Sequence, residues 1–454
     1  MISLKKYRII RKVRSLLPVN ISRNYRHYLE IRNMLKKTEK YSQEEISGLQ
    51  FQKLKYLIDY CWNNIPGYRN HWEKGDFHPD NLKTLDDIKL IPFISKKILK
   101  RQLDSFSNKT INHLEIQKTG GSTGIPFGFY QQSKNGIIEK AFIHNLWSRF
   151  YPEINLKTKA TILRGRKIKG DIQIDPMHGL ILSSFNLSPE NIKKFVKAIE
   201  KCKTPILHAY PSSLYIMARI MQRHNIKLSH QFESIMLGSE VLYNFQKETI
   251  KTVFNSPICH WYGHAEKTVL AANCEEDDRL YIYPQYGITE IITPSGKYAS
   301  PGETGEIIGT GFWNFATPFI RYKTMDYAEC GETQNTKCDL LYPTMSKIEG
   351  RQQELIVGKS SKLVTLAAVS LICGKLPNID QFKFYQRVIG QIEFHYVKIE
   401  PDVKIDIKQI ILSLQYILGN DFEITTQEVE KIPLTKTGKL CYLDQQLEIN
   451  EFIQ

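Results

Sequence analysis

Apolar residues along the chain follow two different periods, which divide it into helical and strand-like stretches. Residues 41–62 carry apolar side chains three or four positions apart, as one face of an amphipathic helix does. The stretches 211–224 and 244–254 repeat this helical period. Short apolar runs between the helices read as strands, at 160–163, 205–210, 233–238 and 257–263. Such alternation predicts an α/β protein with parallel strands.

The pattern changes twice in the second half of the chain. Residues 280–330 alternate polar and β-forming side chains, which predicts hairpins. A shorter α+β pattern follows residue 350. We therefore expect a large domain over residues 41–350, made of α/β sheets with a helical cap and a β-rich subdomain. A small α+β domain is expected over residues 351–454.

The first 40 residues form a separate, basic segment. They hold twelve Lys or Arg and two Glu, so they carry +10 of the net charge of +15. Ile9, Val13 and Leu16 share one face of a predicted helix that is basic elsewhere. The favoured interpretation is a helix packed on the main domain with a solvated basic face. Peripheral contact of residues 1–40 with an anionic membrane is the alternative. No nucleic-acid module accompanies the charge, so no nucleic-acid partner is expected.

The cysteines and apolar runs indicate a cytoplasmic protein. Eight cysteines occur without a CxxC pair, and basic residues interrupt the apolar stretches near residue 1. No apolar run reaches the roughly 18 residues of a membrane-spanning helix. Association with the inner face of the membrane stays open through residues 1–40. A zinc site from Cys274, Cys330, Cys338 and a nearby His is a less favoured alternative, because its spacing is wide.

Polar residues follow several of the predicted strands directly. They are Tyr210, Gly238–Glu240 and Tyr262–Glu266. In α/β sheets, ligands bind beyond the carboxyl ends of the strands. A glycine-rich loop, "TGGSTGIP" at 119–126, precedes them. It lacks the Gly-Lys-Ser/Thr ending of a Walker A phosphate-binding loop. Its successive backbone N–H groups could still bind an anion. A tight hairpin would use similar residues.

Five segments in chain order resemble the adenylate-forming superfamily of acyl-CoA synthetases. The resemblance is to the phenylacetate–coenzyme A ligase branch, and within it to the capsular polysaccharide biosynthesis group. The segments are "TGGSTGIP", "GSE" at 238–240 with "WYGHAE" at 261–266, "RYKTMD" at 321–326, "EGRQQE" at 349–354 and "IPLTKTGKL" at 432–440.

The resemblance implies a two-step reaction. A carboxylic acid attacks the α-phosphate of ATP and forms an acyl adenylate, and coenzyme A, a carrier protein or an amine then takes the acyl group. Relatives rotate a mobile C-terminal domain about the hinge between the two steps. The small-molecule carboxylate would bind near Tyr130, Tyr210, Gly238 and His264.

The resemblance also assigns roles to individual residues. Lys439 would bridge the carboxylate and the α-phosphate, and Glu266 would hold Mg²⁺. Asp326 would accept hydrogen bonds from the ribose, with Arg351 nearby, and Tyr262 and Gly263 would line the adenine with the 238–240 segment. The nucleotide-binding residues are expected to be Thr119, Gly120, Gly121, Ser122, Thr123, Gly124, Gly238, Ser239, Glu240, Tyr262, Gly263, Asp326 and Arg351.

Three positions depart from the family pattern. Ala265 stands where Thr is usual, and Met325 replaces a common Gly. In the hinge, Gln353 or Glu354 stands where the family usually has Asp or Lys. These departures keep a second hypothesis open: a non-catalytic relative that binds nucleotide or a polysaccharide-assembly partner. A basic membrane-binding or nucleic-acid-binding protein is a third, weaker hypothesis.

Overall fold

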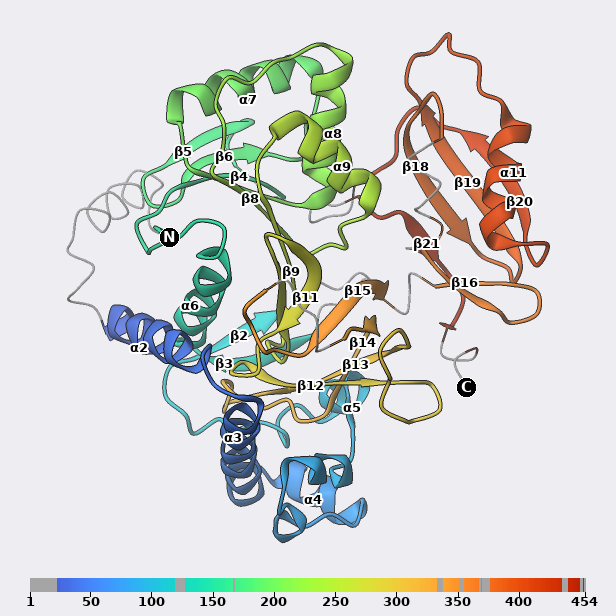
Figure 1. The fold of residues 1–454 in the computed structure, drawn as a ribbon. Helices are drawn as coiled ribbons and strands as arrows, with labels where there is room; N and C mark the ends of the chain where they lie inside the picture. The colour runs from blue at the N-terminus through green and yellow to red at the C-terminus, as the bar shows by residue number, and fades with distance from the viewer. Residues whose placement is uncertain are drawn as a thin grey trace. The chain divides into compact units, whose positions relative to one another are not determined.

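The computed structural model describes residues 23–118, 127–165, 168–332, 338–351, 355–366, 376–434 and 440–449, with the single residues 369 and 452. Figure 1 shows the helices and strands of the described chain, which divides into two compact units. Of the described residues, the first unit holds those within 157–260 and 349–454, and the second holds those within 23–156 and 261–348. The predicted boundaries at residues 40 and 350 stay predictions.

A mostly parallel sheet organises the first part of unit one. β4 (Ala160–Arg164) lies between β6 (Gly179–Ser183) and β7 (Ile206–Ala209), and β8 (Ser234–Gly238) follows β7. All these neighbours pair in parallel, and only the edge strand β5 (Ile172–Asp175) runs antiparallel to β6. The carboxyl ends of β4, β7 and β8 therefore meet at one edge of the sheet, as the sequence pattern predicts.

Three helices cover this sheet, and local signals fix where they begin. α7 (Pro189–Cys202) starts at Ser188, whose side chain caps the backbone of Asn191. α8 (Pro211–Arg223) starts with a proline at its first position, where the missing N–H costs nothing. α9 (Asn244–Phe254) follows β8. The predicted helices at 211–224 and 244–254 are thus confirmed, whereas α7 was not predicted.

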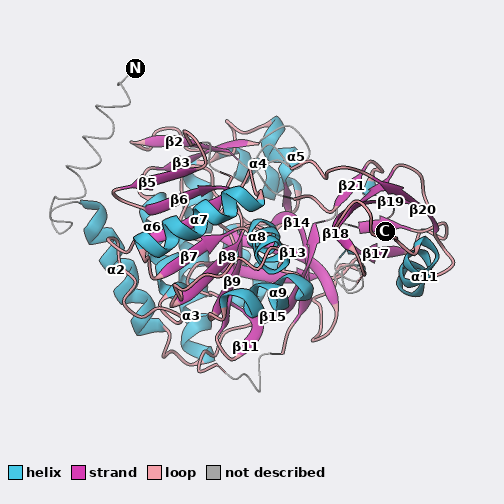
Figure 2. Cartoon of the chain, turned by 90° about the horizontal axis from the view of Figure 1, so that it is seen from above, coloured by secondary structure: helices cyan, strands magenta, loops and turns pink. Residues whose placement is uncertain are grey.

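The C-terminal part of unit one is a small α+β layer. β18 (Ile379–Gln386) pairs antiparallel with β19 (Gln391–Lys398). The outer strands β20 (Glu423–Glu428) and β21 (Leu443–Gln445) pair in parallel with β19 and β18. Figure 2 shows α11 (Ile407–Leu418) along this sheet. A separate two-stranded sheet joins β16 (Leu355–Val357) and β17 (Leu363–Thr365).

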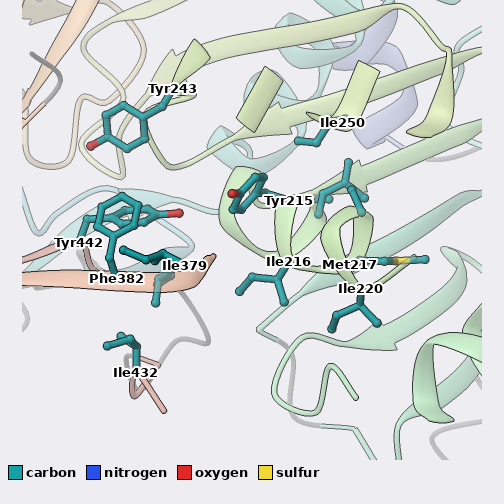
Figure 3. Close-up of a cluster of buried hydrophobic side chains, with 14 of the residues drawn as sticks. Tyr215, Ile216, Met217, Ile220, Tyr243, Ile250, Ile379, Phe382, Ile432 and Tyr442 are labelled. Carbon is teal, nitrogen blue, oxygen red and sulfur yellow. The ribbon is translucent and has the colours of Figure 1, made fainter. Parts of the chain in front are cut away.

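An aromatic cluster packs the C-terminal layer against α8 and α9 within unit one. The Tyr442 ring lies 4.9 Å from the Phe382 ring and meets Tyr243 edge-on at 5.7 Å (Figure 3). The Tyr442 hydroxyl also accepts a hydrogen bond from Gln246 at 3.0 Å. Outside this cluster, Arg223 of α8 forms an ion pair with Asp380 at 2.5 Å.

Unit two begins with helices. α2 (Arg23–Thr38) and α3 (Gln43–Asn64) come first, and a capping box of Ser42 and Glu45 starts α3. The predicted helix at 41–62 is therefore confirmed. The remaining elements of this region are α4 (Pro66–Lys74), two 3₁₀ turns (Pro79–Asn81 and Leu85–Leu90), β1 (Ile94–Ser95), α5 (Lys96–Arg101), the hairpin β2 (Leu114–Lys118) and β3 (Gly128–Gln132), and α6 (Asn135–Trp147).

An antiparallel sheet completes unit two and confirms the predicted hairpins. β12 (Gly287–Ile292), β13 (Thr304–Gly311) and β14 (Tyr322–Cys330) are consecutive antiparallel neighbours. β15 (Thr344–Arg351), β11 (Asp277–Ile282) and β10 (Leu270–Cys274) follow in that order. β9 (Ile258–Gly263) pairs antiparallel with β10 through its last residues. The α/β fold class with a β-rich subdomain is therefore confirmed.

Candidate active site

A buried carboxylate, Glu266, occupies the turn that follows β9. The backbone N–H of Lys267 donates to the carbonyl of His264 at 3.1 Å and closes this turn. Glu266 is 8% exposed. Its Oε2 lies 3.2 Å from Nδ1 of His264, and its Oε1 accepts a hydrogen bond from the Tyr322 hydroxyl at 2.9 Å. Tyr322 is the first residue of β14, so two distant segments of unit two hold this one carboxylate.

The surroundings of Glu266 keep it ionised. Burial by itself would raise its pKa, but the hydrogen bond and charge of His264, with the Tyr322 hydrogen bond, lower the pKa to about 2. A carboxylate that is charged and protected from bulk water suits a divalent cation. Each of its oxygens has lone pairs beyond the one hydrogen bond described.

The ring of His264 is fixed from its other side. Nε2 lies 3.1 Å from Oγ1 of Thr268, whose side chain is buried. Thr268 fits here only because residue 309 is glycine: a Cβ on Gly309 would lie 2.0 Å from that hydroxyl oxygen. His264 was considered for the acyl pocket, with a hydrogen-bonded strand-end histidine as the alternative. The structure shows both ring nitrogens in contact with side chains.

Asp326 lies in the same unit and is also buried. Its Oδ2 accepts a hydrogen bond from the Tyr262 hydroxyl at 2.7 Å, and the residue is 8% exposed. The preceding residue, Met325, has φ 62°, in the left-handed region that favours glycine. Its N–H donates to Glu306 at 3.1 Å. The departure from the family's glycine therefore keeps the glycine-like backbone.

Within unit one, a separate candidate segment ends β8. Gly238 is buried at the strand end, and Ser239 has φ 70°. The Glu240 carboxylate accepts hydrogen bonds from the backbone N–H of Ser212 at 2.9 Å and from its hydroxyl at 3.1 Å. Ser212 is the second residue of α8, so Glu240 caps the first turn of that helix. This structural role was not predicted.

Arg164 joins the same strand-end region and was missed by the sequence analysis. It is the last residue of β4, and its guanidinium reaches the residues after β7 and β8. NH2 donates to the Ser239 hydroxyl at 2.8 Å, and NH1 lies 3.0 Å from Nε2 of His208. The guanidinium carbon lies 4.5 Å from the centre of the Tyr210 ring. Arg164 directly follows the strand predicted at 160–163, so the strand-end rule that selected Tyr210 could have found it.

Several predicted site residues lie outside the described part of the chain. These are Thr119, Gly120, Gly121, Ser122, Thr123, Gly124, Gln353, Glu354 and Lys439. Arg351 ends β15, and only its backbone is described. Leu440, which follows Lys439 in the sequence, donates its N–H to the Ser212 hydroxyl at 3.4 Å. Ser212 therefore contacts both the 238–240 segment and the C-terminal segment within unit one.

The alternative zinc site finds no support in the described residues. Among them, no group of three or more His, Cys, Asp or Glu side chains is placed to bind a metal. Cys274 and Cys338 do form a side-chain hydrogen bond with each other. Cys338 also accepts from NH1 of Arg149 at 3.6 Å.

The chain is similar to proteins of one enzyme class. It is 24% identical over 408 residues to protein CapK of Staphylococcus aureus, covering 87% of this chain and 88% of that protein. It is also 24% identical over 400 residues to phenylacetate–coenzyme A ligase of Aromatoleum evansii, covering 81% and 84%. The chain is therefore similar over most of its length to phenylacetate–coenzyme A ligases. No protein-family model matches the chain.

One solved structure has a fold similar to that of this chain. It is the crystal structure of 2-hydroxyisobutyryl-CoA ligase in the postadenylation state, in complex with R3-HIB-AMP. The TM-score is 0.74 at 14% identity, with 92% of this chain and 94% of that chain covered. The likeness supports the fold, and the residue-level assignments above stay predictions. No helix in the described residues has the length and apolar character needed to cross a bilayer.

Proposed function

We propose that the chain activates a small carboxylic acid with ATP, forming an acyl adenylate and pyrophosphate. It then passes the acyl group to coenzyme A, as an acid–thiol ligase. The similar proteins named above support this class of reaction. One of them, 2-hydroxyisobutyryl-CoA ligase, has a crystal structure in complex with an acyl adenylate. The observation that carries the proposal is the buried, ionised Glu266, which stands at the family's metal position.

The described residues suit the nucleotide half of such a site. Mg²⁺ prefers one or two carboxylates, with phosphate oxygens and water completing its octahedron. Glu266 supplies such a carboxylate, already charged at neutral pH and oriented by His264 and Tyr322. A bound Mg²⁺ would neutralise the phosphate charge as the pyrophosphate leaves. Asp326 is held by Tyr262 as an acceptor for the ribose hydroxyls.

The remaining parts of the proposal rest on the resemblance. Thr119–Gly124 would hold the β- and γ-phosphates through backbone N–H groups, and Lys439 would contact the carboxylate and the α-phosphate. A carrier protein or an amine is the alternative acceptor. A role in surface polysaccharide biosynthesis, in the cytoplasm or at the inner face of the membrane, follows from the likeness to the capsular group.

A non-catalytic relative is the second candidate, and one departure from the family pattern favours it. Ala265 stands where the family usually has Thr, so one hydroxyl contact would be missing. In such a protein ATP would bind without turnover. Measuring pyrophosphate release separates the two candidates, because only the enzyme makes release depend on an acid.

The test is carboxylate-dependent pyrophosphate release with Mg-ATP over a panel of aryl, fatty, hydroxy and amino acids. Wild type runs beside Lys439→Ala, first without and then with coenzyme A. Loss of the lysine charge should lower the adenylation rate on the order of 10²–10³-fold. The matched control is Lys431→Ala, which removes an exposed lysine from the same C-terminal region. ATP binding without release for every acid would overturn the proposal in favour of the non-catalytic relative.

A further inference from the structure

Arg164 presents a positive charge at the strand ends of unit one, where the nearby Glu240 carboxylate accepts hydrogen bonds from Ser212. No carboxylate in the described parts of the chain forms an ion pair with its guanidinium. Its described contacts are a hydroxyl, an imidazole nitrogen and the face of a tyrosine ring. Its buried Nε has no hydrogen-bond partner among the described residues. NH1 and NH2 each carry two N–H bonds and use one of them in the contacts above, so each keeps a donor that can bind an anion.

The neighbouring side chains hold the guanidinium in one orientation. Because a guanidinium only donates hydrogen bonds, Nε2 of His208 accepts, which places the proton of that imidazole on Nδ1. Ser239 accepts a second N–H, and the Tyr210 ring lies against the guanidinium plane at 4.5 Å. The group is thus fixed before any ligand binds, which lowers the entropy lost on binding.

The location of Arg164 connects it to the acid substrate. Two of the residues expected around the acyl group are Tyr210 and Gly238. The guanidinium lies over the Tyr210 ring and donates a hydrogen bond to Ser239, which follows Gly238 in the sequence. All these residues belong to unit one.

We propose that the acid activated by this protein is a dicarboxylic acid, and that Arg164 binds the carboxylate that does not react. This inference rests on the proposed function. One carboxylate of the substrate would be adenylated, while the second would pair with the guanidinium fork. Arg164 then determines which acids are selected, and it takes no part in the chemical step. The same guanidinium would also suit a phosphate of the nucleotide or of coenzyme A, so the test separates these sources.

The experiment compares acids of matched chain with one and two carboxylates: butyrate with succinate, hexanoate with adipate, and phenylacetate with 4-carboxyphenylacetate. Wild type, Arg164→Gln and Arg164→Lys are assayed by pyrophosphate release, with KM values for acid, ATP and coenzyme A. For wild type, kcat/KM should favour a diacid at least about tenfold, as expected for a charged hydrogen bond.

Substitutions of Arg164 test whether this residue causes the preference for diacids. Arg164→Gln should lower kcat/KM for the diacid by about tenfold to a hundredfold through KM, with the monoacid nearly unchanged. Arg164→Lys should recover part of the loss, because it keeps the charge without the planar fork. The control Arg69→Gln removes an exposed arginine and should change nothing. Equal use of mono- and diacids by wild type would overturn the inference. So would an Arg164→Gln effect on the KM of ATP or coenzyme A in place of the diacid.

A binding measurement keeps the inference testable if no acid is adenylated. Adipate or succinate alone should raise the melting temperature of wild type but not of Arg164→Gln. If pyrophosphate release is absent and this difference persists, the proposed function fails while the anion site stands. If no diacid shifts the wild-type melting temperature and none is activated, the inference fails as well.

Discussion

The Tyr322 hydroxyl donates a hydrogen bond to Glu266 from 56 residues further along the chain, at 2.9 Å. The phenol and the imidazole of His264 approach different oxygens of one carboxylate. Because both partners stabilise the charged form, a buried glutamate stays ionised where burial alone would favour its protonated form. The local environment of Glu266 therefore supports the role that the family resemblance gives it.

The depressed pKa of Glu266 makes stability depend on pH. In the unfolded chain the carboxyl has its ordinary pKa of 4.5, whereas in the folded protein it is about 2. The stabilising contribution is therefore complete above about pH 4.5 and is lost as the pH falls towards 2. It amounts to on the order of 3 kcal/mol. We expect urea unfolding of wild type and Glu266→Gln to show a stability difference that shrinks below pH 4.5.

A control identifies the residue responsible for this pH effect. Glu275→Gln removes an exposed carboxylate from the same unit. Its stability difference from wild type should stay small from pH 7 to pH 3. A Glu266→Gln difference that does not change across the same range would contradict the depressed pKa.

Met325→Gly should stabilise the protein. Met325 has φ 62°, a conformation that costs a side-chain-bearing residue roughly 1–2 kcal/mol and costs glycine little. Glycine's greater freedom in the unfolded chain offsets part of the gain, so we expect about 0.5–1 kcal/mol in chemical denaturation. The comparison variant is Lys323→Gly in the same strand, where φ is not positive, and it should destabilise by a similar amount. If Met325→Gly and Lys323→Gly destabilise the protein equally, the positive φ of Met325 is not a source of strain.

Ser212→Ala should weaken both activity and stability. Its hydroxyl donates to Glu240 and accepts the N–H of Leu440, the residue after Lys439. Losing these hydrogen bonds should cost about 1 kcal/mol and lower the adenylation kcat by roughly threefold to tenfold. Ser413→Ala is the matched control, because that exposed hydroxyl donates only within its own helix at 2.8 Å. Unchanged kcat in Ser212→Ala would show that this serine does not support the role proposed for Lys439.

Cys338 should be the reactive thiol of the Cys274–Cys338 pair. A hydrogen bond from Cys274 lowers the pKa of Cys338 to about 7, with a further contribution from the charge of Arg149. The same hydrogen bond and burial raise the pKa of Cys274. Alkylation by iodoacetamide, followed by peptide mass spectrometry, should become fast for Cys338 at a lower pH than for an ordinary thiol.

Cys274 is the internal control for the reactivity of Cys338. Cys274 should stay unlabelled at pH 7, because its thiol is buried and donates to Cys338. Arg149→Gln should move the labelling midpoint of Cys338 upwards, because a neighbouring positive charge is lost. Equal labelling of the two cysteines at pH 7 would show that the asymmetry is absent.

The sequence by itself determined the elements whose periodicity is strong. The helix at 41–62 and the strands and helices between 205 and 263 follow their apolar patterns, because each buries one face or a whole strand. The strand-end rule also selected Glu240, Tyr262 and Glu266 as candidate site residues, because ligands of α/β sheets bind beyond the carboxyl ends of strands. The helix at 189–202 was missed although its Ser-Pro start and amphipathic pattern are in the sequence.

Only the tertiary structure decided what these polar residues touch. Tyr322 begins β14 and Glu266 lies in the turn after β9, 56 residues earlier, so no local pattern reveals their hydrogen bond. Glu240 caps a helix that starts 29 residues earlier, and Arg164 meets Ser239 across the end of the one intervening strand, β7. Hydrogen bonds between distant segments depend on strand order and register, which hydrophobic periodicity does not encode. The ionised state of Glu266 and the orientation of Arg164 are therefore properties of the folded protein.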